Sequence, residues 1–251
     1  MARDKSAVQD HAVVSREEWL AARKALLAKE KQFTRQRDQL SRERRELPWV
    51  KVEKKYVFDG PKGKETLADL FDGRSQLVVY HFMFNPEADA GCPHCSFWAD
   101  NFNGVTVHMN HRDVTFVAIS RAPLAKLEAF KKRLGWSFKW LSSGGTDFNY
   151  DYGASFTPEQ IRDKAVVYNY QNADMDMADR EGTSVFYKDA SGAVYHTYSA
   201  YARGIDILNT AYNYLDFVPK GRDEDELEFT QSWVRYHDKY DTANAQAWPD
   251  R

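Results

Sequence analysis

Two stretches in the middle of the chain have the apolar pattern of strands that are covered on both faces. Residues 76–84 and 114–119 are rich in β-branched and aromatic side chains and contain no acidic residue, lysine or arginine, which is typical of the inner strands of a parallel sheet. A loop with Pro86 and Gly91 follows the first stretch. Pro123 follows the second and begins a helical pattern that Gly135 ends. The pattern predicts a strand-helix-strand core.

Shorter patterns on either side predict further strands and helices. They are a strand at 49–58, a turn at 59–63, a short helix at 66–71, strands at 136–141 and 165–168, a hairpin at 184–198 with a polar turn, and a helix at 206–215. This order predicts an α/β fold with a mixed central sheet flanked by helices, parallel in the middle and antiparallel at one edge. Active sites of such sheets lie at the carboxyl ends of the central strands.

A long charged helix is expected before this domain. Ser15 and Glu18 form a capping box, and the helix can run to Glu46. Its apolar residues make only a partial stripe, so we expect a solvated helix that packs on the domain or pairs with a second copy in a homodimer. Acidic residues dilute its positive charge, which argues against a nucleic-acid or membrane surface. We therefore divide the chain into a lead-in and helix (1–47), the α/β domain (48–218) and a charged C-terminal tail (219–251).

Charge and composition narrow the function classes. The 35 basic and 37 acidic residues leave a formal charge of −2, so no polyanionic partner is indicated. The start at Met1 leads into no apolar signal segment, and no apolar run approaches the ~18 residues of a membrane span. We expect a cytoplasmic protein without a nucleotide cofactor, because the glycines near 144 lack the spacing of a phosphate loop.

The candidate chemistry lies in the only two cysteines, Cys92 and Cys95. They follow the first apolar strand, and Pro93 suits the first position of a helix. A thiolate at a helix N-terminus is stabilised by unpaired N–H groups and the helix dipole, which makes Cys92 the expected nucleophile. Cys95 would be the resolving thiol, and His94 would tune the pair. In a reducing compartment such a pair is more often catalytic or metal-binding than a structural disulfide.

Two other interpretations of the cysteines remain open. His108 and His111 follow at nearly the spacing of a zinc finger, although only two residues separate the histidines and Gly104 is expected to interrupt the helix before them. The cysteines can also be inert buried thiols. The catalytic hypothesis requires that the two sulfurs not both be closed off from solvent.

Several segments resemble a bacterial thioredoxin-like family of unknown function, domain of unknown function 899. They are 47–50, 80–84, 91–100, 120–123, 148–151, 197–204 and 233–235. That family is related to the alkyl hydroperoxide reductase and thiol-specific antioxidant branch, so the resemblance implies a thioredoxin-like fold and redox chemistry. The tetrapeptide from Cys92 to Cys95 also looks like the active site of the bacterial periplasmic disulfide oxidase, in which the intervening histidine stabilises the reduced thiolate.

The chain departs from these relatives at two places. Thioredoxin-fold oxidoreductases have a cis-proline opposite the dithiol, where this chain has Thr183. Related peroxidases have a proline seven residues and a threonine or serine three residues before the attacking cysteine. Here Pro86 is six residues and Asp89 three residues before Cys92, and a carboxylate there would raise the pKa of the thiol.

We therefore expect a thiol-disulfide oxidoreductase that acts on a protein or small-molecule disulfide with an unidentified electron donor, and that needs no metal or other cofactor. Cys92, His94 and Cys95 are the expected catalytic residues, and Pro93, Trp98, Thr183 and Arg203 are expected to bind the substrate. The alternatives are a peroxiredoxin-like peroxide reductase and a non-catalytic module that binds a metal or a protein. A second cluster, Tyr195, His196, Tyr198, Tyr201 and Arg203, either neutralises an anionic ligand or caps the hairpin.

Overall fold

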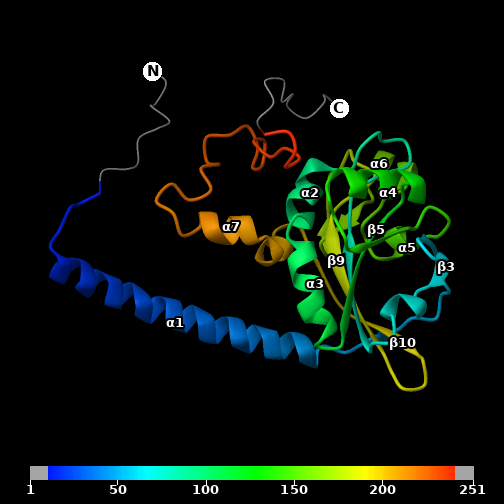
Figure 1. The fold of residues 1–251 in the computed structure, drawn as a ribbon, viewed down its shortest axis with the longest axis horizontal. Helices are drawn as coiled ribbons and strands as arrows, with labels where there is room; N and C mark the ends of the chain where they lie inside the picture. The colour runs from blue at the N-terminus through cyan, green and yellow to red at the C-terminus, as the bar shows by residue number, and fades with distance from the viewer. Residues whose placement is uncertain (1–10, 241–251) are drawn as a thin grey trace.

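The computed structural model describes residues 11–240. Within them, the main sheet has eight strands in the order β1-β10-β9-β4-β5-β6-β2-β3 (Figure 1). The strands are β1 (Val50–Lys51), β2 (Val57–Gly60), β3 (Gly63–Thr66), β4 (Gln76–His81), β5 (Val114–Ser120), β6 (Lys139–Ser142), β9 (Gly182–Lys188) and β10 (Val194–Tyr201). β4, β5 and β6 are parallel. On one side β9 is antiparallel to β4 and β10 is antiparallel to β9, and on the other side β2 is antiparallel to β6. The predicted mixed sheet is confirmed.

Alternating side chains of the sheet build two cores, one on each face. On one face, which we call the α2 face, Tyr80 and Ala118 contact the side chains of α2 (Pro93–Ala99), α3 (Phe102–Asn110), α4 (Leu124–Arg133) and α7 (Thr210–Leu215). On the other, which we call the α5 face, Val79 and Ile119 contact side chains of α5 (Phe148–Asp151) and of the 3-10 helix η1 (Asp69–Phe71). Burial of both faces explains the uninterrupted apolar pattern of β4 and β5.

Smaller elements complete the described chain. They are α6 (Pro158–Arg162), the separate hairpin of β7 (Val167–Tyr168) and β8 (Gln171–Asn172), and the 3-10 helix η2 (Ala202–Leu208). Among residues 11–240, no helix combines the length and the apolar composition needed to cross a bilayer.

Three predicted elements differ from the structure. The single strand expected at 49–58 is two strands, because β1 pairs with β10 and β2 pairs with β6, far across the sheet. The helix expected at 206–215 divides at Asn209, whose side chain accepts a hydrogen bond from the Tyr212 N–H (3.1 Å) and so starts α7 anew. Gly104 lies inside α3, and the break before His108 falls between α2 and α3.

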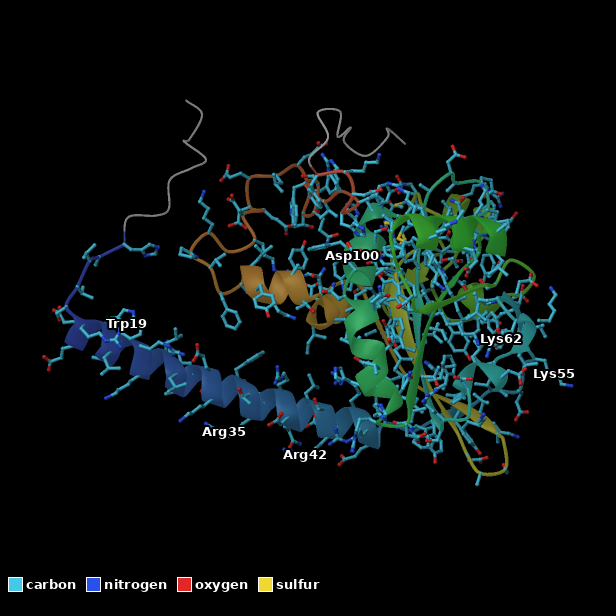
Figure 2. All side chains as sticks on the ribbon, in the orientation of Figure 1. Trp19, Arg35, Arg42, Lys55, Lys62 and Asp100 are labelled. Atoms are coloured by element: carbon cyan, nitrogen blue, oxygen red, sulfur yellow. The ribbon has the colours of Figure 1, made fainter. Side chains whose placement is uncertain are left out.

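The predicted N-terminal helix is confirmed as α1 (Arg16–Glu46), and its capping box between Ser15 and Glu18 is formed. None of its residues is buried, and Trp19 is 46% exposed. Figures 1 and 2 show α1 extending away from the sheet, with Trp19 at its far end and Arg42 near the end that meets the domain. At its C-terminal end the Arg44 guanidinium lies over the Tyr198 ring of β10, 4.8 Å from the ring centroid. The rest of the helix depends on its cap and its own backbone hydrogen bonds.

Residues 219–240, which we call the C-terminal strap, lie within the predicted charged tail and have no regular helix or strand. Figure 1 shows the strap, in orange to red, passing close to the upper end of α2. Val234 and Glu224 are buried within it. The remaining part of the predicted tail, 241–251, lies outside the described residues, as do residues 1–10 of the lead-in.

Candidate dithiol site

Cys92 and Cys95 lie at the first turn of α2, immediately after β4 and its loop. Cys92 is the N-cap residue and Pro93 the first helical residue, as the sequence predicted. The Cys95 backbone N–H donates to the Cys92 sulfur (3.5 Å), and the Met83 N–H donates to the Cys95 sulfur (3.4 Å). The Cys92 N–H in turn donates to the Met83 carbonyl (3.0 Å). The loop is therefore fixed against the end of β4 by main-chain contacts of both cysteines.

The surroundings separate the two thiols electrostatically. A hydrogen bond from the Cys95 thiol, and contacts with His94, hold the pKa of Cys92 well below its usual value, although burial opposes them. Burial raises the pKa of Cys95 well above its usual value, and the neighbouring Cys92 raises it further. One sulfur is thus disposed to be a thiolate and the other to keep its proton, which is the division expected of a nucleophile and a resolving thiol.

His94 supports the ionised state of Cys92. Burial lowers the pKa of the imidazole, but the hydrogen bond and charge of Cys92 and a hydrogen bond to the backbone of Gln231 outweigh burial, so that the pKa lies above its usual value. An imidazolium beside a thiolate stabilises the negative charge on sulfur. The partner Gln231 belongs to the C-terminal strap, so the strap takes part in the electrostatics of the site.

Both sulfurs are buried in this conformation. Cys92 is 6% exposed and Cys95 is 1% exposed. The requirement that the sulfurs not both be closed off from solvent is therefore not met unless the cover moves. The C-terminal strap contributes to this cover: the Tyr236 hydroxyl donates to the Gly91 carbonyl next to Cys92 (2.7 Å), and the Phe229 ring lies 6.1 Å from the His94 ring.

Two groups of polar contacts hold the strap in place. The buried Glu224 accepts hydrogen bonds through one carboxylate oxygen from the Tyr212 hydroxyl (2.8 Å), the Trp233 indole (2.6 Å) and the Gln231 N–H (3.1 Å). Nearer its end, Asp238 forms a two-pronged ion pair with Arg133 of α4 (2.8 and 2.9 Å), and His237 contacts Asp100 (2.7 Å). Charge-assisted contacts of this kind are stronger than neutral ones, so the strap is fastened along its length.

The structure places the predicted substrate residues in different surroundings. Thr183 pairs across the sheet with Tyr80 and Ala200, so its side chain is on the α2 face. Its hydroxyl is buried without a hydrogen-bond partner. The buried hydroxyl of Tyr80 lies beside Cys95, which helps to raise its pKa. Thr183 and Tyr80 therefore lie on the same face of the sheet as the dithiol. The sequence analysis had predicted Thr183 as a site residue but not Tyr80.

Trp98 and Arg203 have other partners. The Trp98 indole is buried and donates to the Ile205 carbonyl (3.0 Å), which joins α2 to η2. The Arg203 side chain is 89% exposed and pairs with Asp206 (3.4 Å). Within residues 11–240, the partner of Arg203 is thus Asp206 and not the dithiol.

The histidines of the zinc interpretation lie apart from the cysteines. His108 is on α3 and His111 at its C-terminal end, and both are exposed. Across the described part of the chain, no three His, Cys, Asp or Glu side chains gather closely enough to hold a metal ion. The geometry of this region therefore gives the zinc-finger interpretation no support.

Together, the fold and the site define a thioredoxin-like protein: a central β4-β5 pair joined through α2, an antiparallel β9-β10 pair beside β4 and a helix after it, with the dithiol at the carboxyl end of β4. The chain belongs to the family described as bacterial protein of unknown function (DUF899), whose model matches residues 8–240. None of the curated proteins matches its sequence.

Solved structures with a similar arrangement are peroxiredoxins. They include peroxidoxin BcpB from Mycobacterium tuberculosis (TM-score 0.44, 15% identity, 65% of this chain and 94% of that chain) and peroxiredoxin Q from Xanthomonas campestris (0.44, 12%, 64% and 89%). A yeast mitochondrial 1-Cys peroxiredoxin has a TM-score of 0.39 at 15% identity, covering 65% of this chain and 74% of that chain. Because these scores are low, the assignment of the fold rests on the strand order.

Proposed function

We propose that the protein is a thiol-disulfide oxidoreductase whose nucleophile is Cys92. The observation that carries this proposal is the electrostatic asymmetry of the pair, in which the pKa of Cys92 is lowered by Cys95 and His94 while burial raises that of Cys95. Inert thiols in an apolar core would both have raised pKa values. A reducing cytoplasm suits this role, because dithiols are catalytic there more often than structural.

The reaction balances as two exchanges of sulfur. The Cys92 thiolate attacks one sulfur of a substrate disulfide, the substrate S–S bond breaks, and a first thiolate leaves. Cys95 then loses its proton and attacks the Cys92 sulfur of the mixed disulfide, which releases the second thiolate. The substrate gains two electrons, the protein keeps a Cys92–Cys95 disulfide, and an external dithiol is required to return it to the reduced state.

Access of a substrate to Cys92 requires that the C-terminal strap move. The contact of Tyr236 with Gly91 and the packing of Phe229 near His94 place the strap beside Cys92. Local opening of a segment without regular structure costs less than global unfolding. In this proposal the closed conformation protects the thiolate between turnovers.

The test is reduction of insulin disulfides by dithiothreitol, with wild type compared with Cys92→Ser and Cys95→Ser. We expect Cys92→Ser to fall to the uncatalysed rate, and Cys95→Ser to accumulate a mixed disulfide that intact-protein mass spectrometry detects. Equal rates for the three proteins would overturn the proposal. Faster oxidation of Cys92 by hydrogen peroxide than by a disulfide would instead favour a peroxide reductase.

His94→Gln tests the tuning of the thiolate. Because the imidazole helps to lower the pKa of Cys92, its removal is expected to raise that pKa by about one unit or more. Thiolate absorbance at 240 nm against pH, with Cys92→Ser as the blank, measures the shift. An unchanged titration would show that His94 has no part in it.

A further inference from the structure

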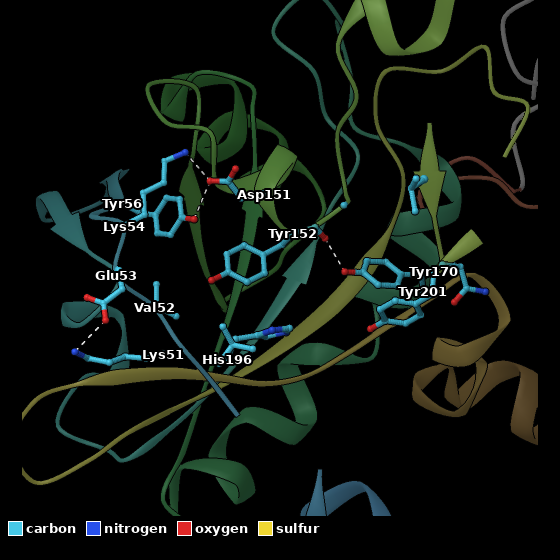
Figure 3. Close-up of a pocket in the computed structure, with 14 residues that line it drawn as sticks. Lys51, Val52, Glu53, Lys54, Tyr56, Asp151, Tyr152, Tyr170, His196 and Tyr201 are labelled. Atoms are coloured by element: carbon cyan, nitrogen blue, oxygen red, sulfur yellow. Dashed lines mark hydrogen bonds and ion pairs between the residues drawn. The ribbon is translucent and has the colours of Figure 1, made fainter. Parts of the chain in front are cut away.

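A cavity of about 450 Å³ opens on the α5 face (Figure 3). A second lobe of about 480 Å³ adjoins it, and the two share Val50, Asn169, Tyr170, His196 and Tyr201. Volumes of this order are typical of small-molecule sites. Unlike the two sulfurs, this region is open to solvent, so the accessible space and the reactive thiols lie on different faces of the sheet.

Tyr170 lies at this cavity in a backbone conformation that a bulky residue rarely adopts. Asn169 and Tyr170 have φ of 49° and 64° and form the two-residue turn between β7 and β8. Such turns favour Asn followed by Gly, because both residues are left-handed. A tyrosine in place of glycine costs of order 1 kcal/mol, and backbone strain of this kind concentrates at ligand clamps.

The Tyr170 side chain is directed by specific contacts. Its hydroxyl donates to the Ser199 carbonyl (2.9 Å), and its ring lies 5.7 Å from the Tyr201 ring. The ring nevertheless remains exposed. The strained turn therefore presents an aromatic surface at the cavity rather than burying it in the core.

His196 provides a hydrogen-bond acceptor in the same wall. Its Nε2 lies 3.1 Å from the Tyr198 carbonyl and 2.8 Å from the Ser199 hydroxyl. A carbonyl can only accept, so Nε2 carries the proton and Nδ1 keeps its lone pair. Burial lowers the pKa of His196, which keeps the imidazole neutral near pH 7. No recorded contact within residues 11–240 occupies Nδ1.

The charged side chains of the cavity are already paired. Lys51 contacts Glu53 (3.1 Å), and Lys54 contacts Asp151 (2.6 Å). Tyrosine rings and valine side chains form much of the remaining wall. Among residues 11–240, the side chains that line the cavity thus offer aromatic surface and one neutral acceptor, and both lysines that line it are already paired.

We propose that this cavity binds a neutral, planar aromatic molecule with a phenolic hydroxyl, whose ring stacks on Tyr170 and whose hydroxyl donates to Nδ1 of His196. The site is independent of the dithiol and of the reaction proposed for it. Aromatic rings in offset or edge contact gain free energy beyond the area that they bury, and a donor on the ligand satisfies the acceptor that the wall leaves open.

The probes are 2-naphthol and 2-methoxynaphthalene, which have the same ring system but differ in the hydroxyl donor. Fluorescence titration of the full chain at pH 7 is expected to show 2-naphthol binding at least fivefold more tightly. Equal affinities would remove the proposed hydrogen bond to His196. Tighter binding of 2-naphthalenesulfonate would show an anion site and would overturn the proposal.

Tyr170→Gly separates the role of the ring from the stability of the fold. Because glycine relieves the left-handed strain, we expect the variant to melt at or above the temperature of wild type while its affinity for 2-naphthol falls at least tenfold. Tyr170→Phe, which keeps the ring, should remain within about threefold of wild type. Unchanged affinity in the folded Tyr170→Gly variant would overturn the proposal.

Discussion

The two faces of the sheet differ in whether their functional groups are charged and whether solvent reaches them. On the α2 face, the thiols have strongly separated pKa values but are covered by the C-terminal strap. On the α5 face, the cavity is open, and its histidine is kept neutral by burial. Reactivity and accessibility are therefore found on different faces in this conformation.

Burial has different consequences for ionisable side chains on the two faces. On the α2 face, burial opposes the ionisation of Cys92, and the neighbouring Cys95 and His94 outweigh it. On the α5 face, burial lowers the pKa of His81 and is not outweighed, even though the Nε2 of His81 contacts the Ser184 hydroxyl (2.9 Å). Charge is thus stabilised on one face by a close partner, whereas on the other it is suppressed by burial and by the neighbouring His196.

The largest expected effect is a loss of folding stability at acid pH, which tests how the two faces differ in the protonation of their buried groups. Burial lowers the pKa of His81 to about 3, whereas the unfolded side chain titrates near ~6.5. The folded state binds the proton more weakly, so this contribution to stability is complete above pH ~6.5 and is lost as the pH falls toward 3. Linkage gives about 1.4 kcal/mol per pH unit, or about 3 kcal/mol by pH ~4.5.

Urea unfolding at pH 7 and at pH 4.5 measures this effect in wild type and His81→Gln. The variant should lose less stability on acidification, by up to that amount. His111→Gln is the matched control, because His111 is exposed. An equal acid loss in wild type and His81→Gln would show that acid sensitivity arises elsewhere, and the contrast between the faces would not extend to their histidines.

A smaller effect is expected from a methyl group beside the dithiol. A Cβ at Gly91 would lie 2.7 Å from the Phe82 ring and 3.1 Å from the Phe130 ring, and both rings are buried. Gly91→Ala should therefore destabilise the protein by about 2 kcal/mol, which thermal melting would show as a fall of several degrees. Gly104→Ala, with open space around its Cβ in α3, should be neutral or stabilising.

If Gly91→Ala and Gly104→Ala melted alike, the close packing around the dithiol loop would not matter to stability. The tight packing of the buried rings beside Cys92 would then not distinguish this part of the α2 face from the open cavity on the α5 face.

The smallest expected effect is on the C-terminal strap, whose opening would make the dithiol more accessible and so reduce the difference in accessibility between the faces. Glu224→Ala leaves three donors of the strap and α7 without their acceptor, so the strap should open more often. We expect alkylation of Cys92 by iodoacetamide to become about tenfold faster, equivalent to about 1.4 kcal/mol in the opening equilibrium. Glu226→Ala, an exposed acid in the same segment, should react as wild type does.

Equal alkylation rates in Glu224→Ala and wild type would mean that Glu224 does not hold the cover closed. Rates measured with Cys95→Ser as background confirm that Cys92 is the residue modified.

The sequence predicted the parts of the fold that have local signals. The capping box of Ser15 and Glu18, the apolar strands and the Pro93 helix start each depend on residues within a few positions of one another, and each is found in the structure. The strand expected at 49–58 was wrong because alternation predicts a strand but not its partner, and the two halves of this segment pair at distant parts of the sheet.

The cover and the cavity depend on contacts that no local pattern carries. Glu224 receives its hydrogen bonds from residues 212, 231 and 233, and a run of acidic residues in sequence indicates only a solvated tail. The turn at Asn169 and Tyr170 lacks the glycine that would have predicted it. Nothing in the sequence around Tyr170 indicated that tertiary contacts would hold its backbone in the left-handed conformation.

Helix α1 has a consequence for the shape of the molecule in solution. Its 31 residues make a rod of about 46 Å, whereas a compact chain of 251 residues has a radius of gyration of about 18 Å. X-ray scattering from a monomer should therefore give a larger radius and an extended tail in the pair-distance distribution. If two copies instead join along α1, which is one of the two arrangements that the sequence predicts, the particle should have two separated masses at the ends of a shared rod.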